Sequence, residues 1–276
     1  MAMTAQRFRP RIVSLAPSVT SILIALGARQ HLVAVSRWCK DVADVRDLPE
    51  LGDCWSLGSD EDLTAMMKLR PTLIVGSVPF ATETVQKILA LPIPFLALNP
   101  RILADVEMDI HTLGRVAQVS ARAEALVQQM RRKFEGVRRA AKRARTRPRV
   151  YCEAWPHPRI SSPPWVAELV EIAGGTMVVA AGQKIPDEEV AQAQPDVIVL
   201  AWTATGGKSK PEQALANPAW RDVPAVRERR VFAVRDELVN TPGPPLVCGA
   251  KELLRILHPE LNADGKTSGK KMRAHS

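Results

Sequence analysis

The chain has 276 residues, of which 46% are hydrophobic and 24% charged, and its formal net charge at pH 7 is +9. This composition is typical of a globular protein, and the length suffices for two domains. An apolar segment at residues 12–28 loosely resembles a signal peptide, but serine, threonine and proline interrupt it, which argues against both an export signal and a membrane span. We therefore expect a cytoplasmic protein as the sequence is written, or a periplasmic one if a leader has been removed.

Strand-like and helix-like segments alternate through the first half of the chain. The predicted strands are residues 11–16, 32–38, 72–77 and 94–98, and the predicted helices are residues 18–26, 60–70, 81–90 and 102–117. Ser18 is the expected N-cap of the first helix, and Gly27 is expected just past its end. Strands separated by helices of this length favour βαβ units and a parallel sheet.

The same alternation begins again in the second half. Here the predicted strands are residues 149–155, 176–180, 196–202 and 231–234, and the predicted helices are residues 165–173, 187–194, a short one from Pro211, and 246–257. The chain therefore reads as an α/β protein with two similar parallel-sheet lobes. We assign residues 1–119 to the first lobe and residues 147–262 to the second, followed by a disordered basic tail at residues 263–276.

A long amphipathic segment at residues 120–146 separates the two lobes. It contains no proline and one continuous apolar stripe, which predicts a single long α-helix joining the lobes. Residues 131–149 hold ten basic residues and one acidic residue, so this stretch alone carries a charge of +9. We interpret the charges as a solvated helix face. Binding to nucleic acid or acidic lipid is the alternative, but no aromatic residue lies among the cations to stack on bases, and we expect no nucleic-acid partner.

Tryptophans are concentrated near the ends of the predicted strands. Trp38, Trp155 and Trp202 end apolar runs, while Trp55 and Trp165 fall in the segments that follow. Because open α/β sheets bind ligands beyond the carboxyl ends of their strands, this distribution favours a site for a large, flat, partly apolar ligand. The alternative is that these rings cap the core beneath the loops.

The motifs that would indicate catalysis are incomplete. The segment at residues 206–209 resembles a phosphate-binding loop, but Trp202 occupies the position of its first glycine, and no Gly-x-Gly-x-x-Gly follows the first strand. Of the five histidines, only His157 lies beside the expected site. Its side chain could ligate a metal or make a simple polar contact, and both interpretations remain open. We expect no enzyme, no metal site and no intrinsic cofactor. Cys39 and Cys54 could form a disulfide or remain two free thiols, and the sequence does not distinguish these states.

Several segments resemble a known protein family. Residues 11–27 (RIVSLAPSVTSILIALG) and 62–74 (DLTAMMKLRPTLI) are similar to the helix-linked, class III substrate-binding proteins of ABC importers for cobalamin and iron-siderophores. Residues 153–158 (EAWPHP), 165–175 (WVAELVEIAGG), 230–234 (RVFAV) and 240–247 (NTPGPPLV) look most like the cobalamin-binding subgroup. The resemblance covers about residues 10–260, and it implies two Rossmann-like lobes joined by one long helix.

The resemblance implies a monomeric protein that holds a corrinoid between its lobes and whose second partner is an ABC importer permease. Carried over by position, the ligand-binding residues are Ala16, Pro17, Ser18, Trp38, Trp55, Trp155, Trp202 and Asn240. Glu188 falls where the second-lobe glutamate of the family docks onto its transporter. The first-lobe counterpart is Thr64, a departure from the family pattern.

Two other interpretations remain open. The same fold could bind haem or a ferric siderophore, for which Arg37, Arg159 and Lys184 are the candidate cations in the cleft. The second interpretation is an enzyme that acts on a cobamide or a nucleotide, but the missing catalytic motifs argue against it.

Overall fold

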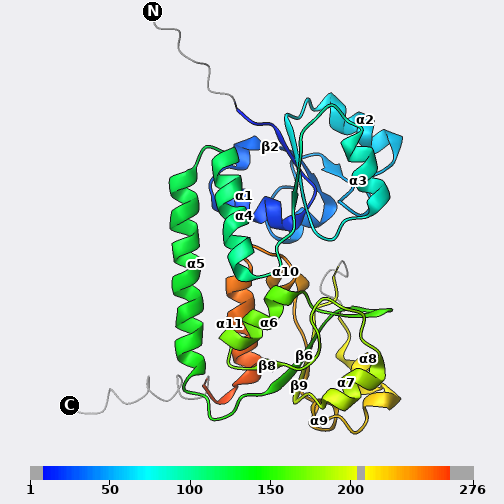
Figure 1. Ribbon diagram of the computed structural model, residues 1–276, viewed down its shortest axis with the longest axis vertical. Helices are drawn as coiled ribbons and strands as arrows, with labels where there is room; N and C mark the ends of the chain where they lie inside the picture. The colour runs from blue at the N-terminus through cyan, green and yellow to red at the C-terminus, as the bar shows by residue number, and fades with distance from the viewer. Residues whose placement is uncertain (1–8, 204–208, 262–276) are drawn as a thin grey trace, which may run out of the picture. The chain divides into compact units, whose positions relative to one another are not determined.

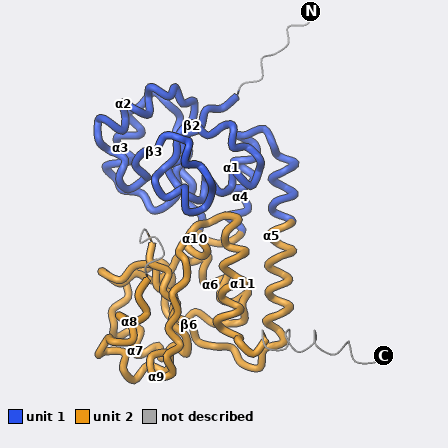
Figure 2. Tube along the Cα trace, turned by 180° about the vertical axis from the view of Figure 1, so that it is seen from behind, with its two compact units in different colours: residues 1–100, 104–128 blue, residues 101–103, 129–276 orange. Residues whose placement is uncertain are grey.

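The computed structural model describes residues 9–203 and 209–261 and divides the chain into two compact units (Figures 1 and 2). Unit 1 is built from the residues up to 100 together with 104–128, and unit 2 from residues 101–103 and those from 129 onward. In each unit, helices cover both faces of a central sheet (Figure 1). The α/β architecture expected from the alternation is confirmed.

The sheet of unit 1 is entirely parallel. Its strand order is β3-β2-β1-β4-β5, with Val13 of β1 opposite Ala34 of β2 and Ile74 of β4. The central strand β1 is wholly buried, as expected for a strand covered by helices on both faces. The strands are β1 Ile12–Ser14, β2 Leu32–Ser36, β3 Glu50–Leu51, β4 Leu73–Ser77 and β5 Phe95–Leu98. The sequence prediction missed β3, which has only two residues.

The helices of unit 1 begin and end for identifiable local reasons. The N-cap of α1 is Ala16 with Pro17 in the first turn, so the prediction of Ser18 as N-cap was wrong, since proline is favoured at the first helical position. Gly27 does follow the helix, with φ of +63°, and its N–H donates to the carbonyl of Ile24. The helices are α1 Pro17–Ala25, α2 Asp60–Lys68, α3 Thr82–Leu89 and α4 Leu103–Val116.

The long helix α5 (Ser120–Ala141) carries the chain from unit 1 into unit 2, as predicted. Its buried stripe comprises Ala123, Val127, Met130, Phe134, Val137 and Ala141. The helix is shorter than the predicted 120–146: it ends at the last residue of this stripe, and Lys142 and Arg143, which follow, are exposed.

The sheet of unit 2 is parallel except for one strand. Its order is β10-β9-β6-β7, and β8 also pairs with β6. The short strand β7 runs antiparallel to β6, with Pro156 opposite Arg159, so the expectation of a purely parallel sheet was wrong here. Because only His157 and Pro158 separate the paired residues, the chain returns as a hairpin. The strands are β6 Arg149–Pro156, β7 Arg159–Ser161, β8 Thr176–Met177, β9 Val197–Leu200 and β10 Val231–Ala233.

The α-helices of unit 2 include two that the sequence did not predict, α9 and α10, which have four residues each. The set is α6 Pro164–Ile172, α7 Asp187–Ala193, α8 Pro211–Leu215, α9 Pro224–Arg227, α10 Asp236–Val239 and α11 Leu246–Leu257. Among the residues that the structure describes, no helix combines the length and apolarity needed to cross a bilayer.

Two helical glycines provide a matched test of backbone packing. A Cβ at Gly249 in α11 would collide with the carbonyl oxygen of Leu238, whereas a Cβ at Gly136 in α5 would meet nothing within 4 Å. We expect Gly249→Ala to lower the free energy of unfolding by about 1–3 kcal/mol, and Gly136→Ala to raise it by up to about 1 kcal/mol. Urea unfolding followed by circular dichroism measures both. Equal effects of the two substitutions would contradict this packing.

One carboxyl group in unit 1 should make stability depend on pH. Burial, together with the nearby charge of Asp105, raises the pKa of Asp109 in α4 to about 7. The ionised form is therefore disfavoured in the folded state, so its contribution to stability falls as pH rises from about 4 to about 7.

We expect Asp109→Asn to remove this fall and to stabilise the protein at pH 8 by about 1–2 kcal/mol, a figure reduced for solvent screening. The measurement is the urea-unfolding midpoint at pH 5 and pH 8, with the exposed Asp44→Asn as control. If Asp109→Asn and the wild type lose stability in parallel over this range, Asp109 is not the group responsible.

Candidate functional site

The carboxyl ends of the unit 1 strands bring three of the predicted ligand-binding loops to one edge of the sheet. The turn after β1 contains Ala16, Pro17 and Ser18, of which Ala16 and Ser18 are buried. This turn lies at the switch point between β1 and β4, where the strand order reverses and where open α/β sheets bind ligands. Trp38 and Trp55 follow β2 and β3 at the same edge.

Asp53 organises the two tryptophans of this edge. Its Oδ2 accepts from Trp38 Nε1 at 2.9 Å, while its Oδ1 accepts from the backbone N–H groups of Trp55 at 3.0 Å and Ser56 at 2.8 Å. Burial raises the pKa of Asp53, but these hydrogen bonds and one from the Ser56 hydroxyl outweigh it and hold the pKa below its ordinary value. The Trp38 ring is thereby fixed, and the Trp55 ring is left 64% exposed.

The strand ends of unit 2 carry the other two predicted tryptophans. Trp155 near the end of β6 is 38% exposed, and its Nε1 donates to the carbonyl of His157 at 2.9 Å. Trp202 follows β9 and is only 6% exposed, packed in a core cluster with Tyr151 and Trp220. The strands β6 and β9 flank the switch point of this sheet, so both rings arise where a ligand is expected, but only Trp155 presents a surface to solvent.

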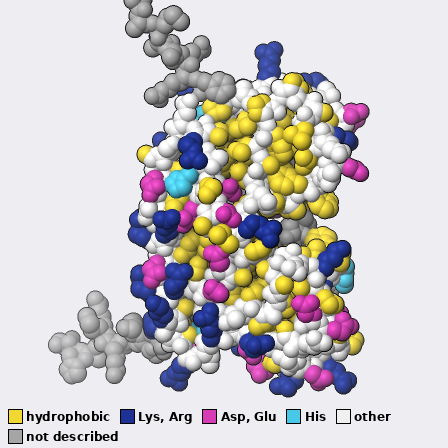
Figure 3. Space-filling view, viewed as in Figure 1, with side chains coloured by type: hydrophobic (Ala, Val, Ile, Leu, Met, Phe, Trp, Pro, Cys, Tyr) yellow, Lys and Arg dark blue, Asp and Glu magenta, His cyan; other side chains and the backbone are white. Residues whose placement is uncertain are grey.

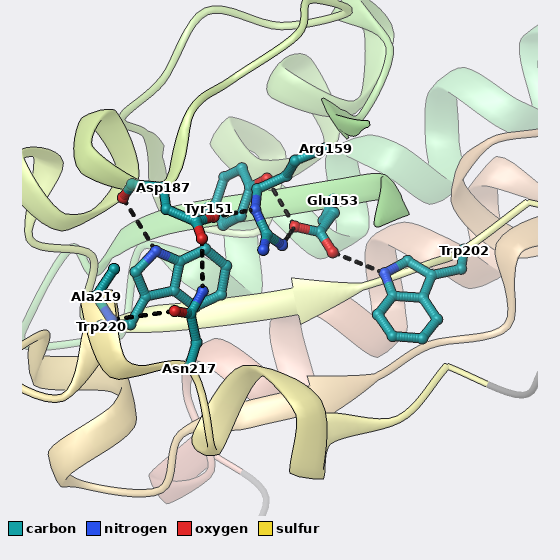
Figure 4. Close-up of polar contacts among 8 residues, drawn as sticks. All are labelled: Tyr151, Glu153, Arg159, Asp187, Trp202, Asn217, Ala219 and Trp220. Atoms are coloured by element: carbon teal, nitrogen blue, oxygen red, sulfur yellow. Dashed lines mark hydrogen bonds and ion pairs between the residues drawn. The ribbon is translucent and has the colours of Figure 1, made fainter. Parts of the chain in front are cut away.

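A buried polar network holds the unit 2 strand ends together (Figure 4). Glu153 of β6 is fully buried; its Oε1 accepts from Trp202 Nε1 at 2.8 Å and its Oε2 from the Tyr151 hydroxyl at 2.9 Å. Arg159 of β7 forms an ion pair with the same Oε2 and a second one, of 2.6 Å, with Asp187 at the start of α7. The network therefore joins β6, β7, α7 and the segment after β9.

Trp220 and Asn217 extend this network into the loop after α8. The guanidinium of Arg159 lies 4.2 Å from the Trp220 ring centroid, and Trp220 Nε1 donates to the Asp187 carbonyl at 3.0 Å. Asn217 Nδ2 donates to Asp187 Oδ2 at 3.1 Å (Figure 4). Burial lowers the pKa of Arg159, but Glu153 and Asp187 outweigh this and raise it. Glu153 also contributes, after burial, to a raised pKa of Tyr151.

The network corrects one sequence assignment. Arg159 is not a free cation for an anionic ligand, because its side chain is 14% exposed and pairs with two carboxylates of its own unit. The other two candidates, Arg37 and Lys184, are exposed, and Arg37 lies 5.7 Å from the Trp38 ring centroid.

Asn240 and Glu188 complete the set of predicted residues. Asn240 follows α10, and its Nδ2 donates to the Ala201 carbonyl at 2.6 Å, which ties it to the segment that carries Trp202. Its Oδ1 is buried without a hydrogen-bond partner among the described residues. Glu188 is exposed in the first turn of α7.

The described residues include no cluster of three or more metal-ligating side chains. All four cysteines are free, which decides the open question of Cys39 and Cys54 in favour of two thiols. Burial raises the pKa of Cys54 to about 12, so it is not a thiolate nucleophile at neutral pH. Residues 206–208 of the phosphate-loop-like segment and the predicted tail at residues 263–276 lie outside the described residues.

The sequence model of one family, the periplasmic binding proteins, matches residues 12–238 of this chain. The chain belongs to the periplasmic binding protein family. Its members are substrate-binding proteins, and this member has the two-lobed fold in which a single long helix joins two α/β units.

Several known proteins resemble the chain over most of its length. The substrate-binding lipoprotein YvrC of an ABC transporter of Bacillus subtilis is 24% identical over 91% of this chain and 80% of its own. The vitamin B12-binding protein of Photorhabdus laumondii is 21% identical over 90% of this chain and 88% of its own. The heme-binding protein RhuT from Roseiflexus superposes with a TM-score of 0.77 at 23% identity, over 92% and 100% of the two chains.

Sequence reasoning missed the two carboxylates that position the tryptophans, Asp53 and Glu153. For Glu153 a signal exists: it lies two residues from Tyr151 in an apolar strand, so these two side chains share one face. An acidic residue at such a position requires hydrogen-bond donors. No spacing in the sequence identifies those donors, because Trp202 lies 49 residues away.

We expect Arg159→Met to lower the free energy of unfolding by about 3–5 kcal/mol, because it leaves Glu153 buried without its cation. The control is Arg221→Met, which breaks an ion pair whose two side chains are more than 80% exposed and should cost less than about 1 kcal/mol. Urea denaturation followed by near-UV circular dichroism measures both.

The double substitution Arg159→Met with Glu153→Leu should recover part of the loss, because the buried charge is then removed as well. A loss for Arg159→Met no larger than that for Arg221→Met would show that the buried pair does not stabilise unit 2.

Proposed function

We propose that this periplasmic binding protein is a non-catalytic carrier of a cobalamin-type corrinoid. The observation that carries the proposal is that the two most exposed tryptophans, Trp55 and Trp155, lie at strand ends, 64% and 38% exposed. Binding of an apolar ligand is favourable where it buries large aromatic rings that are exposed at the ligand-binding edge of a sheet. A corrin ring offers broad apolar faces, and the relative from Photorhabdus laumondii is a vitamin B12-binding protein.

The proposal gives the residues distinct roles. Trp38, Trp55 and Trp155 contact the ring, while Asn240 and the turn of Ala16, Pro17 and Ser18 meet the polar arms of the ligand. Trp202 supports the unit 2 loops from the core, since Glu153 holds its indole N–H and little of its surface is exposed.

Haem is the second candidate, and specific observations favour it. RhuT, whose fold matches this chain, is a heme-binding protein, and the propionate groups of haem require cations. Arg37 lies exposed beside Trp38 in unit 1. On unit 2, His157 and Lys184 line a surface hollow of about 430 Å³. A ferric siderophore would use the same cations. Arg159 also borders the hollow, but its two carboxylate partners already neutralise it.

We further propose that the protein delivers its ligand to an ABC importer permease, because the relative YvrC belongs to such a transporter. Glu188 is the proposed contact residue on unit 2, where it is exposed at the start of α7. Membership of this family favours the periplasmic location over the cytoplasmic one.

Titration with cyanocobalamin, aquocobalamin and hemin tests the ligand class. We expect saturable one-to-one binding of a cobalamin, seen as quenching of tryptophan emission and a shift of the corrin absorption band. Trp55→Ala and Trp155→Ala should each weaken binding by about 10- to 100-fold, because each removes a large apolar contact. Calorimetry gives the affinities of the variants.

The matched control is Met108→Ala, which removes an apolar side chain that is 63% exposed but belongs to helix α4 rather than to a segment that follows a strand, and it should leave affinity unchanged. Binding of hemin alone would replace the first candidate by the second. Failure of all three ligands, or equal affinity in the wild type and both tryptophan variants, would contradict the proposed site.

A further inference from the structure

The C-terminal half of α5 and the turn after it carry a concentrated positive charge that the proposed ligand site does not use. Residues 131–149 contain ten basic residues and one acidic one. Figure 3 shows Lys and Arg side chains gathered along the edge formed by this part of α5. We define the basic surface by its five exposed cations without a partner among the described residues: Arg132, Lys133, Arg139, Lys142 and Arg145.

Other cations of the same stretch have structural contacts. Arg138 pairs with Glu135, Arg147 donates to the Gly175 carbonyl, and Arg149 donates to the Ala193 carbonyl. The cations of the basic surface therefore differ from these three, because the structure gives them no such contact with the described residues.

The helix geometry places this charge on the outside of unit 2. Phe134, Val137 and Ala141 are buried on one side of α5. Arg132 and Arg139 are seven residues apart, so they lie on one face, two turns from each other, and both are exposed. From Arg132 to Lys142 the basic surface extends for about 15 Å.

Helix stabilisation accounts for only part of this charge. Cations favour the C-terminal end of a helix, but that effect is confined to the last turn. Arg139 benefits from it, whereas Arg132 and Lys133 lie more than a turn before the end at Ala141 and Arg145 lies beyond it.

We propose that the basic surface binds the anionic headgroups of a phospholipid bilayer. Arg132 and Arg139 share one face of the helix, and Lys133 and Lys142 flank that face on either side. Long, flexible cations arranged in this way can meet a planar anionic surface, and each basic residue near such a surface adds to the attraction. The exposed part of this stretch contains no aromatic side chain, because Phe134 is buried. Stacking on bases, which single-stranded nucleic acids require, is therefore not provided. The proposal does not depend on the identity of the ligand.

The test is sedimentation of the full chain with vesicles of phosphatidylglycerol and phosphatidylcholine, at low and at physiological salt. We expect binding that requires phosphatidylglycerol and weakens with salt. Replacing Arg132, Lys133, Arg139, Lys142 and Arg145 together by Gln should weaken it at least about tenfold. All five side chains are exposed, so the variant should fold, which an unchanged circular dichroism spectrum and urea-unfolding midpoint would verify.

A matched control removes the same charge elsewhere, by replacing the exposed Arg46, Lys68, Lys210, Arg221 and Lys251 by Gln. A second control replaces the C-terminal Lys266, Lys270, Lys271 and Arg273. Both should bind vesicles nearly as well as the wild type.

Equal losses in the basic-surface variant and the first control would show that net charge alone matters, and a loss confined to the second control would place the contact in the C-terminal segment. Either result overturns the proposal. Binding to an oligonucleotide but to no vesicle overturns it as well, in favour of nucleic acid.

Discussion

Glu153 is an acidic side chain in the middle of the buried strand β6, and its carboxylate would be costly to bury without partners. The requirement is met from three directions, by the Tyr151 hydroxyl, the Trp202 indole and the Arg159 guanidinium. Arg159 in turn engages Asp187, so one buried charge determines how β7 and α7 attach to the sheet. Tyr151 and Trp220 belong both to the polar network and to the apolar cluster. The two sets of contacts therefore stabilise the same part of unit 2.

Unit 1 uses a related arrangement at a more exposed position. Asp53 accepts the indole N–H of Trp38, as Glu153 accepts that of Trp202, and it also fixes the turn that carries Trp55. In each unit, one tryptophan near a strand end is held by a carboxylate while another keeps an exposed ring. This division explains why aromatic residues near the strand ends, alike in sequence, differ so much in exposure, from 64% for Trp55 to 6% for Trp202.

Ligand specificity in this fold must reside in the loops rather than in the sheets. The B12-binding relative and the heme-binding neighbour are similar to this chain over nine-tenths of its length, although their names give different ligands. A shared fold therefore does not fix the ligand, which depends on the side chains at the site. In this chain Arg37 and Lys184 are exposed cations, whereas Arg159 is neutralised within its own unit.

The sequence by itself determined the alternation of strands and helices and the single long helix, because burial imposes a period of two or 3.6 residues that local reading can detect. The family was predicted separately, from the resemblance of segments such as residues 11–27 and 153–158 to known substrate-binding proteins. It could not predict β3 or β7, which are too short to show a period, nor the end of α5 at Ala141. Only the tertiary structure decided that Trp202 is a core residue, that Arg159 is paired and that Cys39 and Cys54 remain free thiols. The first two outcomes depend on Glu153, which lies 49 residues from Trp202 and 6 from Arg159, and such contacts arise only when the sheet has formed.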